Sequence, residues 1–164
     1  INENSEAHKI VGWGYLLGDE GAGYWIGKEA IRLSLFEIET RVKITKGSLS
    51  DRILKEIQAD DWSGIKGFVY SKDRAEIAAL SKIVDQAAEA GDAEAISILK
   101  KAAGHLGDLV NRTDSVLLRK SLPVKFTGGI SGSKILYAEL EKFLRMRVSI
   151  STVDIALRAA ELAR

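Results

Sequence analysis

Gly12-Trp13-Gly14-Tyr15-Leu16-Leu17-Gly18-Asp19-Glu20-Gly21 is the stretch of this 164-residue sequence that decides the fold. Six of the 15 glycines lie between Gly12 and Gly27. Before the stretch, residues 9–11 predict a short strand. After it, residues 23–39 predict a helix, because apolar positions recur at steps of three and four. That apolar stripe consists of Tyr24, Gly27, Ile31, Leu35 and Ile38. A glycine-rich segment between a strand and a helix is a usual place for a ligand-facing loop.

Two features of this stretch are suited to binding. Trp13 stands between two residues without side chains, and Asp19 and Glu20 place two carboxylates in the loop just before the helix. A carboxylate there can accept a hydrogen bond from a sugar hydroxyl or contact the water shell of Mg²⁺. Two plainer interpretations stay open: Asp19 or Glu20 caps the helix, and Trp13 anchors the core. Capping does not explain the glycine density or the tryptophan between glycines.

A second glycine-rich segment, residues 128–133, follows a strand predicted over residues 124–127 and precedes an amphipathic helix. Glycines let the backbone approach a ligand, and free N–H groups at a helix start point outward, so this arrangement suits an anion or a nucleotide. Ser131 and Ser133 add hydroxyl groups. The segment is neither Gly-x-Gly-x-x-Gly nor a Walker loop. Taken alone, these residues favour a tight turn with serine capping.

The rest of the chain is predominantly helical. Helices are predicted over residues 49–57 (capped by Ser48 or Ser50), 62–70, 71–90, 92–110 (capped by Asp92) and 154–164, with a further strand over residues 148–150. There is no internal repeat and no linker. The sequence predicts one α/β domain over residues 1–164, with a small sheet and a large helical share.

Composition excludes several classes of function. With 24 Lys and Arg against 23 Asp and Glu, the net charge is +1, which predicts neither a nucleic-acid nor an anionic-membrane surface. The chain has no cysteine, which excludes disulfides and a thiol nucleophile and is compatible with a reducing cytoplasm. Its two histidines are far apart in sequence and indicate no metal site.

The ungapped segment Gly12-Trp-Gly-x-Leu-Leu-Gly-Asp-Glu-Gly-x-Gly-x-Trp-Ile-Gly27 resembles the signature of the N-acetylglucosamine kinases, which group with the BadF/BadG-type ATPases in the actin-like superfamily. Residues 77–92 are similar to the helix pair below the adenine in that family. Residues 127–133 resemble its adenosine motif. The resemblance spans nearly the whole chain and implies a ribonuclease-H-like C-terminal lobe of an actin-like ATPase.

The resemblance also implies roles for individual residues. The residues that would help hold the sugar are Gly12, Trp13, Gly14 and Asp19. On the nucleotide side, Ala78 would lie near the adenine, and Gly128, Gly129, Ser131 and Ser133 would line the adenosine and the phosphates. ATP and Mg²⁺ are the implied cofactors, and a hexose or hexosamine (N-acetylglucosamine, glucosamine or glucose) is the implied substrate.

The family's two phosphate loops and its catalytic aspartate precede the Gly-Trp-Gly turn, and only 11 residues precede Gly12 here. We therefore expect the C-terminal lobe alone, with no catalytic residue in this chain and no meaningful kinase activity in isolation. A missing N-terminal lobe or partner chain would complete the site, and a homodimer is expected. The alternatives are an ATPase lobe that activates a partner enzyme, disfavoured by the absence of cluster-holding cysteines, and a non-catalytic interaction domain with the kinase fold.

Overall fold

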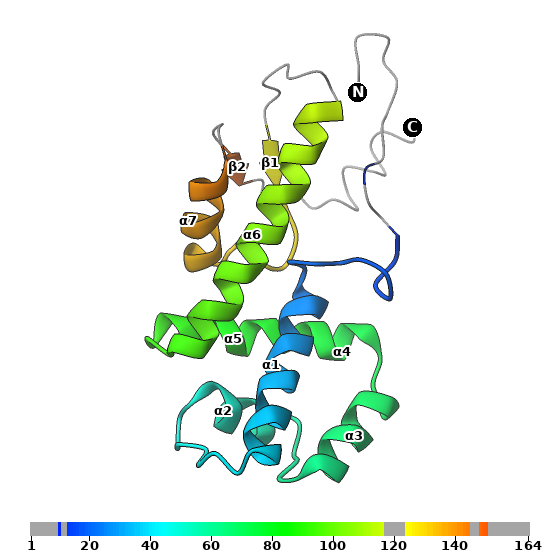
Figure 1. The fold of residues 1–164 in the computed structure, drawn as a ribbon, viewed down its shortest axis with the longest axis vertical. Coiled ribbons are helices and arrows are strands. Elements are labelled where there is room, and N and C mark those ends of the chain that lie inside the picture. Colours follow the sequence, from blue (N-terminus) through cyan, green and yellow to red (C-terminus); the bar gives the residue numbers. More distant parts are fainter. Residues whose placement is uncertain (1–9, 11–12, 117–123, 145–147, 151–164) are drawn as a thin grey trace.

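The computed structural model describes residues 10, 13–116, 124–144 and 148–150. In these ranges the elements are α1 (Gly23–Glu39), α2 (Leu49–Glu56), α3 (Trp62–Ser71), α4 (Arg74–Ala79), α5 (Ser81–Glu89), α6 (Ala93–Val116), β1 (Val124–Phe126), α7 (Lys134–Phe143) and β2 (Val148–Ile150). The large helical share is confirmed (Figure 1). The helix predicted over residues 154–164 lies outside the described residues, and so does the strand predicted over residues 9–11, except Ile10, which is in no helix or strand. None of the described helices is long and apolar enough to cross a membrane.

Helix α1 has the bounds that the apolar spacing predicts. Its buried face is wider than a single stripe, because α2, α4, α5 and α6 all pack against it. That face consists of Trp25, Ile26, Gly27, Ala30, Ile31 and Ser34. The predicted stripe shares Gly27 and Ile31 with it, while the other three members are only partly buried.

The helix predicted over residues 71–90 begins later than expected. Asp73, rather than Ser71, precedes its first turn. The Asp73 carboxylate accepts a hydrogen bond from the Glu76 N–H at 3.0 Å, and the Glu76 carboxylate accepts one from the Asp73 N–H at 3.1 Å. This reciprocal capping box satisfies two N–H groups that the helix itself leaves free. Arg74 is therefore the first residue of α4.

The same predicted helix is divided at Leu80, whose N–H bonds to the carbonyl of Ile77, three residues back. The Ser81 hydroxyl donates to the Ala78 carbonyl at 2.7 Å, so a side chain competes for a helical acceptor. Helices α4 and α5 lie nearly end to end across α1 (Figure 1). Gly27 permits the crossing, because a Cβ at that position would lie 2.0 Å from the Ile77 carbonyl oxygen.

Helices α2, α3 and α6 also begin at side-chain caps. Ser48, Asp61 and Asp92 each accept a hydrogen bond from the backbone N–H three residues further on, at the starts of α2, α3 and α6. Asp92 also accepts one from the Leu49 N–H at 2.8 Å, which joins the starts of α2 and α6. The predicted cap of α6 is confirmed. Its end, Val116, comes later than the predicted end near residue 110.

Strands β1 and β2 pair in parallel, with Val124 opposite Val148 and Phe126 opposite Ile150. Parallel strands need a crossover connection, and the described part of that connection comprises residues 127–133 and α7. Helix α7 packs so closely on α6 that a Cβ at Gly107 would lie only 2.6 Å from the Phe143 Cβ. A ribonuclease-H-like lobe around this strand pair stays a prediction.

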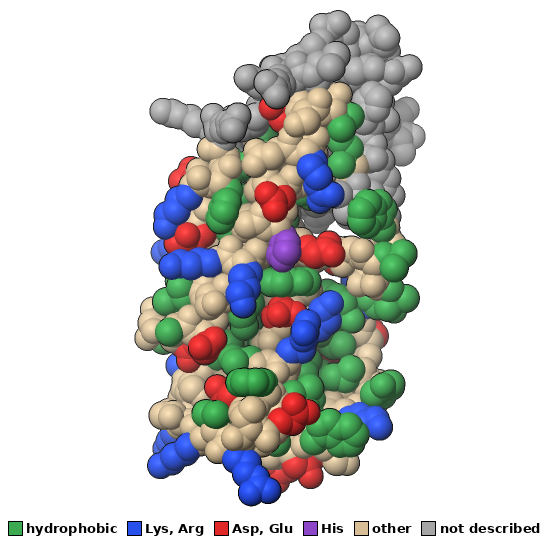
Figure 2. All heavy atoms as spheres, viewed as in Figure 1, with side chains coloured by type: hydrophobic (Ala, Val, Ile, Leu, Met, Phe, Trp, Pro, Cys, Tyr) green, Lys and Arg blue, Asp and Glu red, His purple; other side chains and the backbone are tan. Residues whose placement is uncertain are grey.

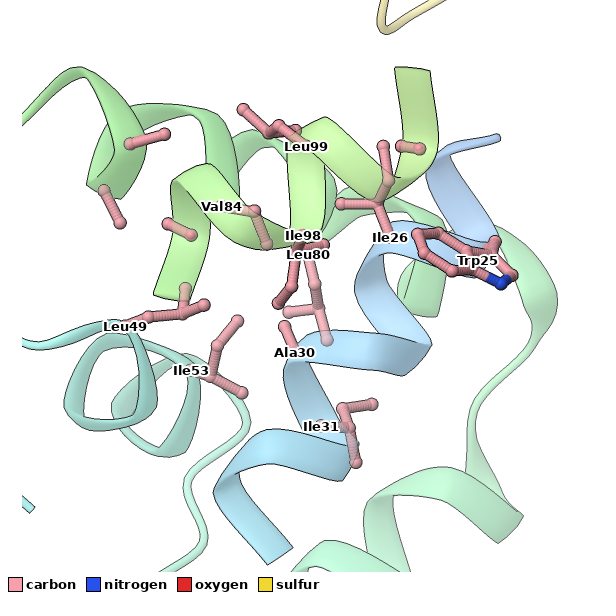
Figure 3. Packing of buried hydrophobic residues seen from close by; sticks show 14 of the residues in the cluster. Trp25, Ile26, Ala30, Ile31, Leu49, Ile53, Leu80, Val84, Ile98 and Leu99 are labelled. Atoms are coloured by element: carbon pink, nitrogen blue, oxygen red, sulfur yellow. The ribbon is translucent and has the colours of Figure 1, made fainter. Parts of the chain in front are cut away.

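The core lies where α1 meets the other helices. Figure 3 shows side chains from α1, α2, α5 and α6 pointing toward one another. Ile26, Ile53 and Val84 have no exposed surface, and Leu136 and Leu140 of α7 extend the same cluster. A core of this extent fixes α1, α4 and α6 relative to one another. Those helices also support the first glycine-rich segment.

Candidate functional site

The first turn, defined here as residues 13–22, is closed by its own backbone. The Gly14 carbonyl accepts a hydrogen bond from the Gly18 N–H at 2.9 Å, and the Asp19 carbonyl accepts one from the Ala22 N–H at 2.9 Å. Asp19 has φ = 70°, in the left-handed region that aspartate tolerates better than most residues. The turn thus carries its carboxylate on a strained but hydrogen-bonded backbone.

Trp13 is 63% exposed, so the interpretation that it anchors the core is wrong. Leu16 and Leu17, on the same turn, are 80% and 74% exposed. Tyr15 packs edge-on against Tyr24 of α1, with ring centroids 5.2 Å apart. The first turn therefore presents an indole and two leucines to the outside.

Asp19 and Glu20 do not cap α1. The N-cap residue is Ala22, and no side chain accepts a hydrogen bond there. The Asp19 Oδ2 atom lies 2.7 Å from the Arg74 Nη2 atom of α4. This oxygen is buried, and the Arg74 N–H is not aligned on it as a hydrogen-bond donor. The carboxylate is thus held against Arg74 by charge.

Gly21 brings the first turn against α6. It has φ = 82°, and a Cβ there would lie 2.7 Å from the Ala102 carbonyl oxygen and 2.8 Å from the Leu106 Cγ. A cavity of about 750 Å³ opens between the turn and the later half of α6. It is lined by Ile10, Trp13, Asp19, Glu20, Ala22, His105, Leu106, Asp108, Leu109, Asn111, Arg112 and Ser115. Figure 2 shows the described histidine, in purple, between acidic and basic side chains.

The second turn, defined here as residues 127–133, is compact, and its last residue caps the helix that follows. The Ser131 hydroxyl donates to the Gly128 carbonyl at 2.7 Å. Ser133 is the N-cap of α7 and accepts from the Leu136 N–H at 3.2 Å. Its hydroxyl also donates to the Asp85 carboxylate of α5 at 2.5 Å. The interpretation as a tight turn with serine capping is confirmed.

A second cavity of about 380 Å³ lies between the second turn and α5. Its lining consists of Ile26, Ser81, Lys82, Asp85, Gln86, Glu89, Leu99, Gly129, Ile130, Gly132, Ser133 and Leu136. Two of the residues predicted to contact the nucleotide, Gly129 and Ser133, are therefore in this wall. Capping and ligand contact are compatible at Gly129, which has no side chain and would have nothing within 4 Å of a Cβ.

The structure distributes the remaining predicted site residues unevenly. Trp13 and Asp19 line the first cavity together, and Gly14 forms the bend between them. Gly128 and Ser131 belong to the second turn without lining its cavity, and Ala78 lies on α4 against Gly23 of α1. Gly12 lies outside the described residues.

The sequence did not predict several of the residues at these two sites. Arg74 contacts Asp19, Asp85 contacts Ser133, and the polar face of α6 forms one wall of the first cavity. The helices that carry them are predictable. The packing of the helices sets which polar residues face a turn more than 40 positions away, and the sequence has no local signal for it.

A metal site is not visible in the part of the chain that the structure describes, where no three His, Cys, Asp or Glu side chains group closely enough to hold an ion. The implied Mg²⁺ stays a prediction.

Comparison with known proteins decides the family. Residues 1–163 match the family model of the BadF/BadG/BcrA/BcrD ATPases. The chain belongs to this ATPase family. The resemblance seen at the first turn is thereby confirmed over almost the full length of the chain.

Three proteins similar to this chain are named as kinases of N-acetylated amino sugars. The chain is 32% identical to the N-acetylmuramic acid/N-acetylglucosamine kinase of Clostridium acetobutylicum over 150 residues, covering 88% of this chain and 48% of that protein. It is 29% identical to the N-acetyl-D-glucosamine kinase of Dictyostelium discoideum, covering 99% and 54%. A crystal structure from Chromobacterium violaceum, described as "Putative N-acetylglucosamine Kinase", matches with a TM-score of 0.78 at 26% identity, covering 99% and 54%. The chain thus spans about half the length of these relatives.

Proposed function

We propose that this chain is the C-terminal lobe of an ATP-dependent kinase that phosphorylates a hydroxyl group of an amino sugar. The observation that carries the proposal is the first turn. It presents an exposed indole and a carboxylate to one cavity, and neither core packing nor helix capping accounts for these two side chains. Both kinases matched by sequence take N-acetylated amino sugars by name, which sets the substrate class of the proposal.

The chemistry of the first cavity suits a sugar. A carboxylate accepts hydrogen bonds from hydroxyl groups, and an indole face covers the apolar C–H face of a pyranose ring. Asp19 and Trp13 offer these two surfaces from one turn, and both line the same cavity. At about 750 Å³ the cavity falls in the range typical of small-molecule sites.

The second cavity suits the nucleoside part of ATP. The turn backbone at Gly129 is open, and a volume of about 380 Å³ accommodates a base with its ribose. Asp85 and Glu89 line the same cavity. Carboxylates accept hydrogen bonds from ribose hydroxyls but repel phosphates. The proposal therefore assigns the adenosine to this wall and the contacts with phosphates and Mg²⁺ to residues outside it.

The proposal needs a second half for catalysis. Phosphoryl transfer depends on a base that orients the acceptor hydroxyl and on groups that stabilise charge on the phosphates. We assign these to the part of the relatives that this chain does not match. Leu16 and Leu17 provide an exposed apolar surface on which such a half, or a partner subunit, can close. The expected homodimer belongs to the same proposal, and light scattering of the isolated chain tests it.

The first experiment measures phosphoryl transfer from ATP by the full native polypeptide that carries this chain. The acceptors are N-acetylglucosamine, N-acetylmuramic acid, glucosamine and glucose. We expect turnover with at least one N-acetylated sugar and none by the isolated lobe. Absence of phosphorylation of all four sugars would contradict the proposal.

Variants of the first turn then locate the sugar. Asp19→Asn should lower kcat/KM for the sugar by roughly 10- to 100-fold, because a hydrogen bond to a charged acceptor is worth about 1.5–3 kcal/mol. Trp13→Ala should lower it by about tenfold while changing the free energy of unfolding by less than about 0.5 kcal/mol, because the side chain is exposed. The matched control is Trp62→Ala on α3, a tryptophan that is 50% exposed and lines neither cavity. Equal effects of the two tryptophan variants would rule out a sugar-binding role for Trp13.

A further inference from the structure

Arg74 contacts the first turn at two places. Its Nη2 atom lies 2.7 Å from the Asp19 Oδ2 atom, and its guanidinium carbon lies 5.5 Å from the centre of the Tyr15 ring. A guanidinium at that distance is attracted to the face of an aromatic ring. Arg74 therefore holds the beginning and the middle of the turn from one position on α4.

Helix α4 is a rigid base for this contact. The capping box of Asp73 and Glu76 fixes its first turn, where Arg74 lies. The close approach of Gly27 to the Ile77 carbonyl fixes α4 against α1, which the first turn leads into. The guanidinium is thus anchored to the same scaffold as the turn that it contacts.

The contact gives the Asp19 carboxylate a fixed orientation. An ion pair whose side chains are 54% and 23% exposed adds little to the stability of a protein. It has a geometric effect, however. With Oδ2 directed at Arg74, the carboxylate is held in one orientation at the wall of the first cavity. Orientation before binding lowers the entropic cost of capturing a ligand.

We propose that Arg74 is the positioning residue of the sugar site, which aims the Asp19 carboxylate and holds the first turn in its binding conformation. This inference rests on the proposed function, since it assigns a role within the same site. Arg74 itself does not line the first cavity and acts on the ligand through Asp19.

The test is a double-mutant cycle in the full native polypeptide. Arg74→Gln should lower kcat/KM for the sugar by about tenfold, mainly through a higher sugar KM, and leave the KM for ATP within about twofold. Combining it with Asp19→Asn should cost no more than Asp19→Asn alone, because both changes remove one interaction. Arg74→Lys should restore part of the loss, since it keeps the charge but lacks the planar group that covers Tyr15. Independent, multiplying effects of the two changes would overturn the inference.

A matched control and a ligand-free measurement separate this inference from the proposed function. Arg32→Gln removes another exposed arginine–carboxylate pair, Arg32 with Glu29 at 3.1 Å, and should leave sugar kinetics unchanged. In the absence of any ligand, the Gly18 and Ala22 amides should exchange hydrogen at least several-fold faster in Arg74→Gln than in Arg32→Gln, because their hydrogen bonds close the first turn. Unchanged exchange overturns the positioning role even if sugars are phosphorylated. Faster exchange supports the holding of the turn even if no sugar is a substrate, in which case the proposed function alone fails.

Discussion

The two glycine-rich turns of this protein each lead into a helix, but they are held in different ways. The second turn carries its own cap, because the Ser133 hydroxyl accepts from the Leu136 N–H at the start of α7. The first turn leads into α1 without any side-chain cap, and its carboxylate is paired with α4. The cap of the second turn joins neighbours in sequence, whereas the carboxylate of the first turn is paired with a residue more than 50 positions away.

This difference indicates which side chains of the two turns are not explained by contacts within the protein. Capping and a hydrogen bond to Asp85 account for the Ser133 hydroxyl without any ligand. No such contact accounts for the exposed Trp13, which lines the first cavity. The first turn is therefore the stronger evidence for a binding site, in agreement with its more specific sequence pattern.

The largest effects are expected from substitutions of glycines in the two turns. Gly21→Ala should lower the free energy of unfolding by about 2–5 kcal/mol, because the left-handed backbone costs about 1–2 kcal/mol and crowding a further 1–3. The crowding comes from α6, since a Cβ at Gly21 would meet the Ala102 carbonyl at 2.7 Å. Gly14→Ala and Gly128→Ala, with positive φ and nothing within 4 Å, should cost only about 1–2 kcal/mol. Urea unfolding measures all three. Equal losses would show that the first turn is not packed on α6 as described.

A smaller effect is expected from the serines of the second turn. Ser133→Ala should lower the free energy of unfolding by about 1–2 kcal/mol, because an N-cap is lost and Asp85 loses its partner. Ser131→Ala should cost less than about 0.5 kcal/mol, because its hydroxyl only bonds the Gly128 carbonyl within the turn. Thermal unfolding of the two variants side by side makes the measurement. If Ser131→Ala proved as costly as Ser133→Ala, capping would not be what organises this turn.

The parts of the fold that sequence predicts are those governed by nearby residues. The apolar spacing over residues 23–39 gives the bounds of α1, and Asp92 marks the start of α6, because periodicity and capping act within a few positions. The division of the helix at Leu80 was not predictable in this way. It accompanies the close approach of Gly27 to Ile77, a contact between residues 50 positions apart.

The residues of the candidate site also fall into two groups: some are recognisable from nearby sequence, and others depend on how the helices pack. Trp13 and Asp19 were recognisable from glycine density and from resemblance to a kinase signature, both of which are read along the chain. Arg74 was not, because it is one of many surface arginines until α4 is packed against α1. The exposure of Trp13 was likewise undecided in the sequence, since an aromatic residue between glycines suits a core as well as a surface.

The smallest expected effect is a pH dependence of hydrogen exchange in the first turn. It tests whether α4 supports this turn. The hydrogen bond from Lys72, followed by that from the Asp73 N–H, lowers the pKa of Glu76 below its ordinary value. Since the folded pKa is the lower one, this stabilisation of α4 is complete above the unfolded pKa, near 4.3, and is lost as the pH falls through the folded value. Acidification from about pH 5 to pH 3 should therefore loosen α4 and, through Arg74, speed hydrogen exchange at Gly18 and Ala22. Glu76→Gln should remove the part of this acid response that comes from α4, while Asp51→Asn, which removes another carboxylate of lowered pKa on α2, should leave it intact. If Asp51→Asn abolished the response and Glu76→Gln did not, α4 would not be the support of the first turn.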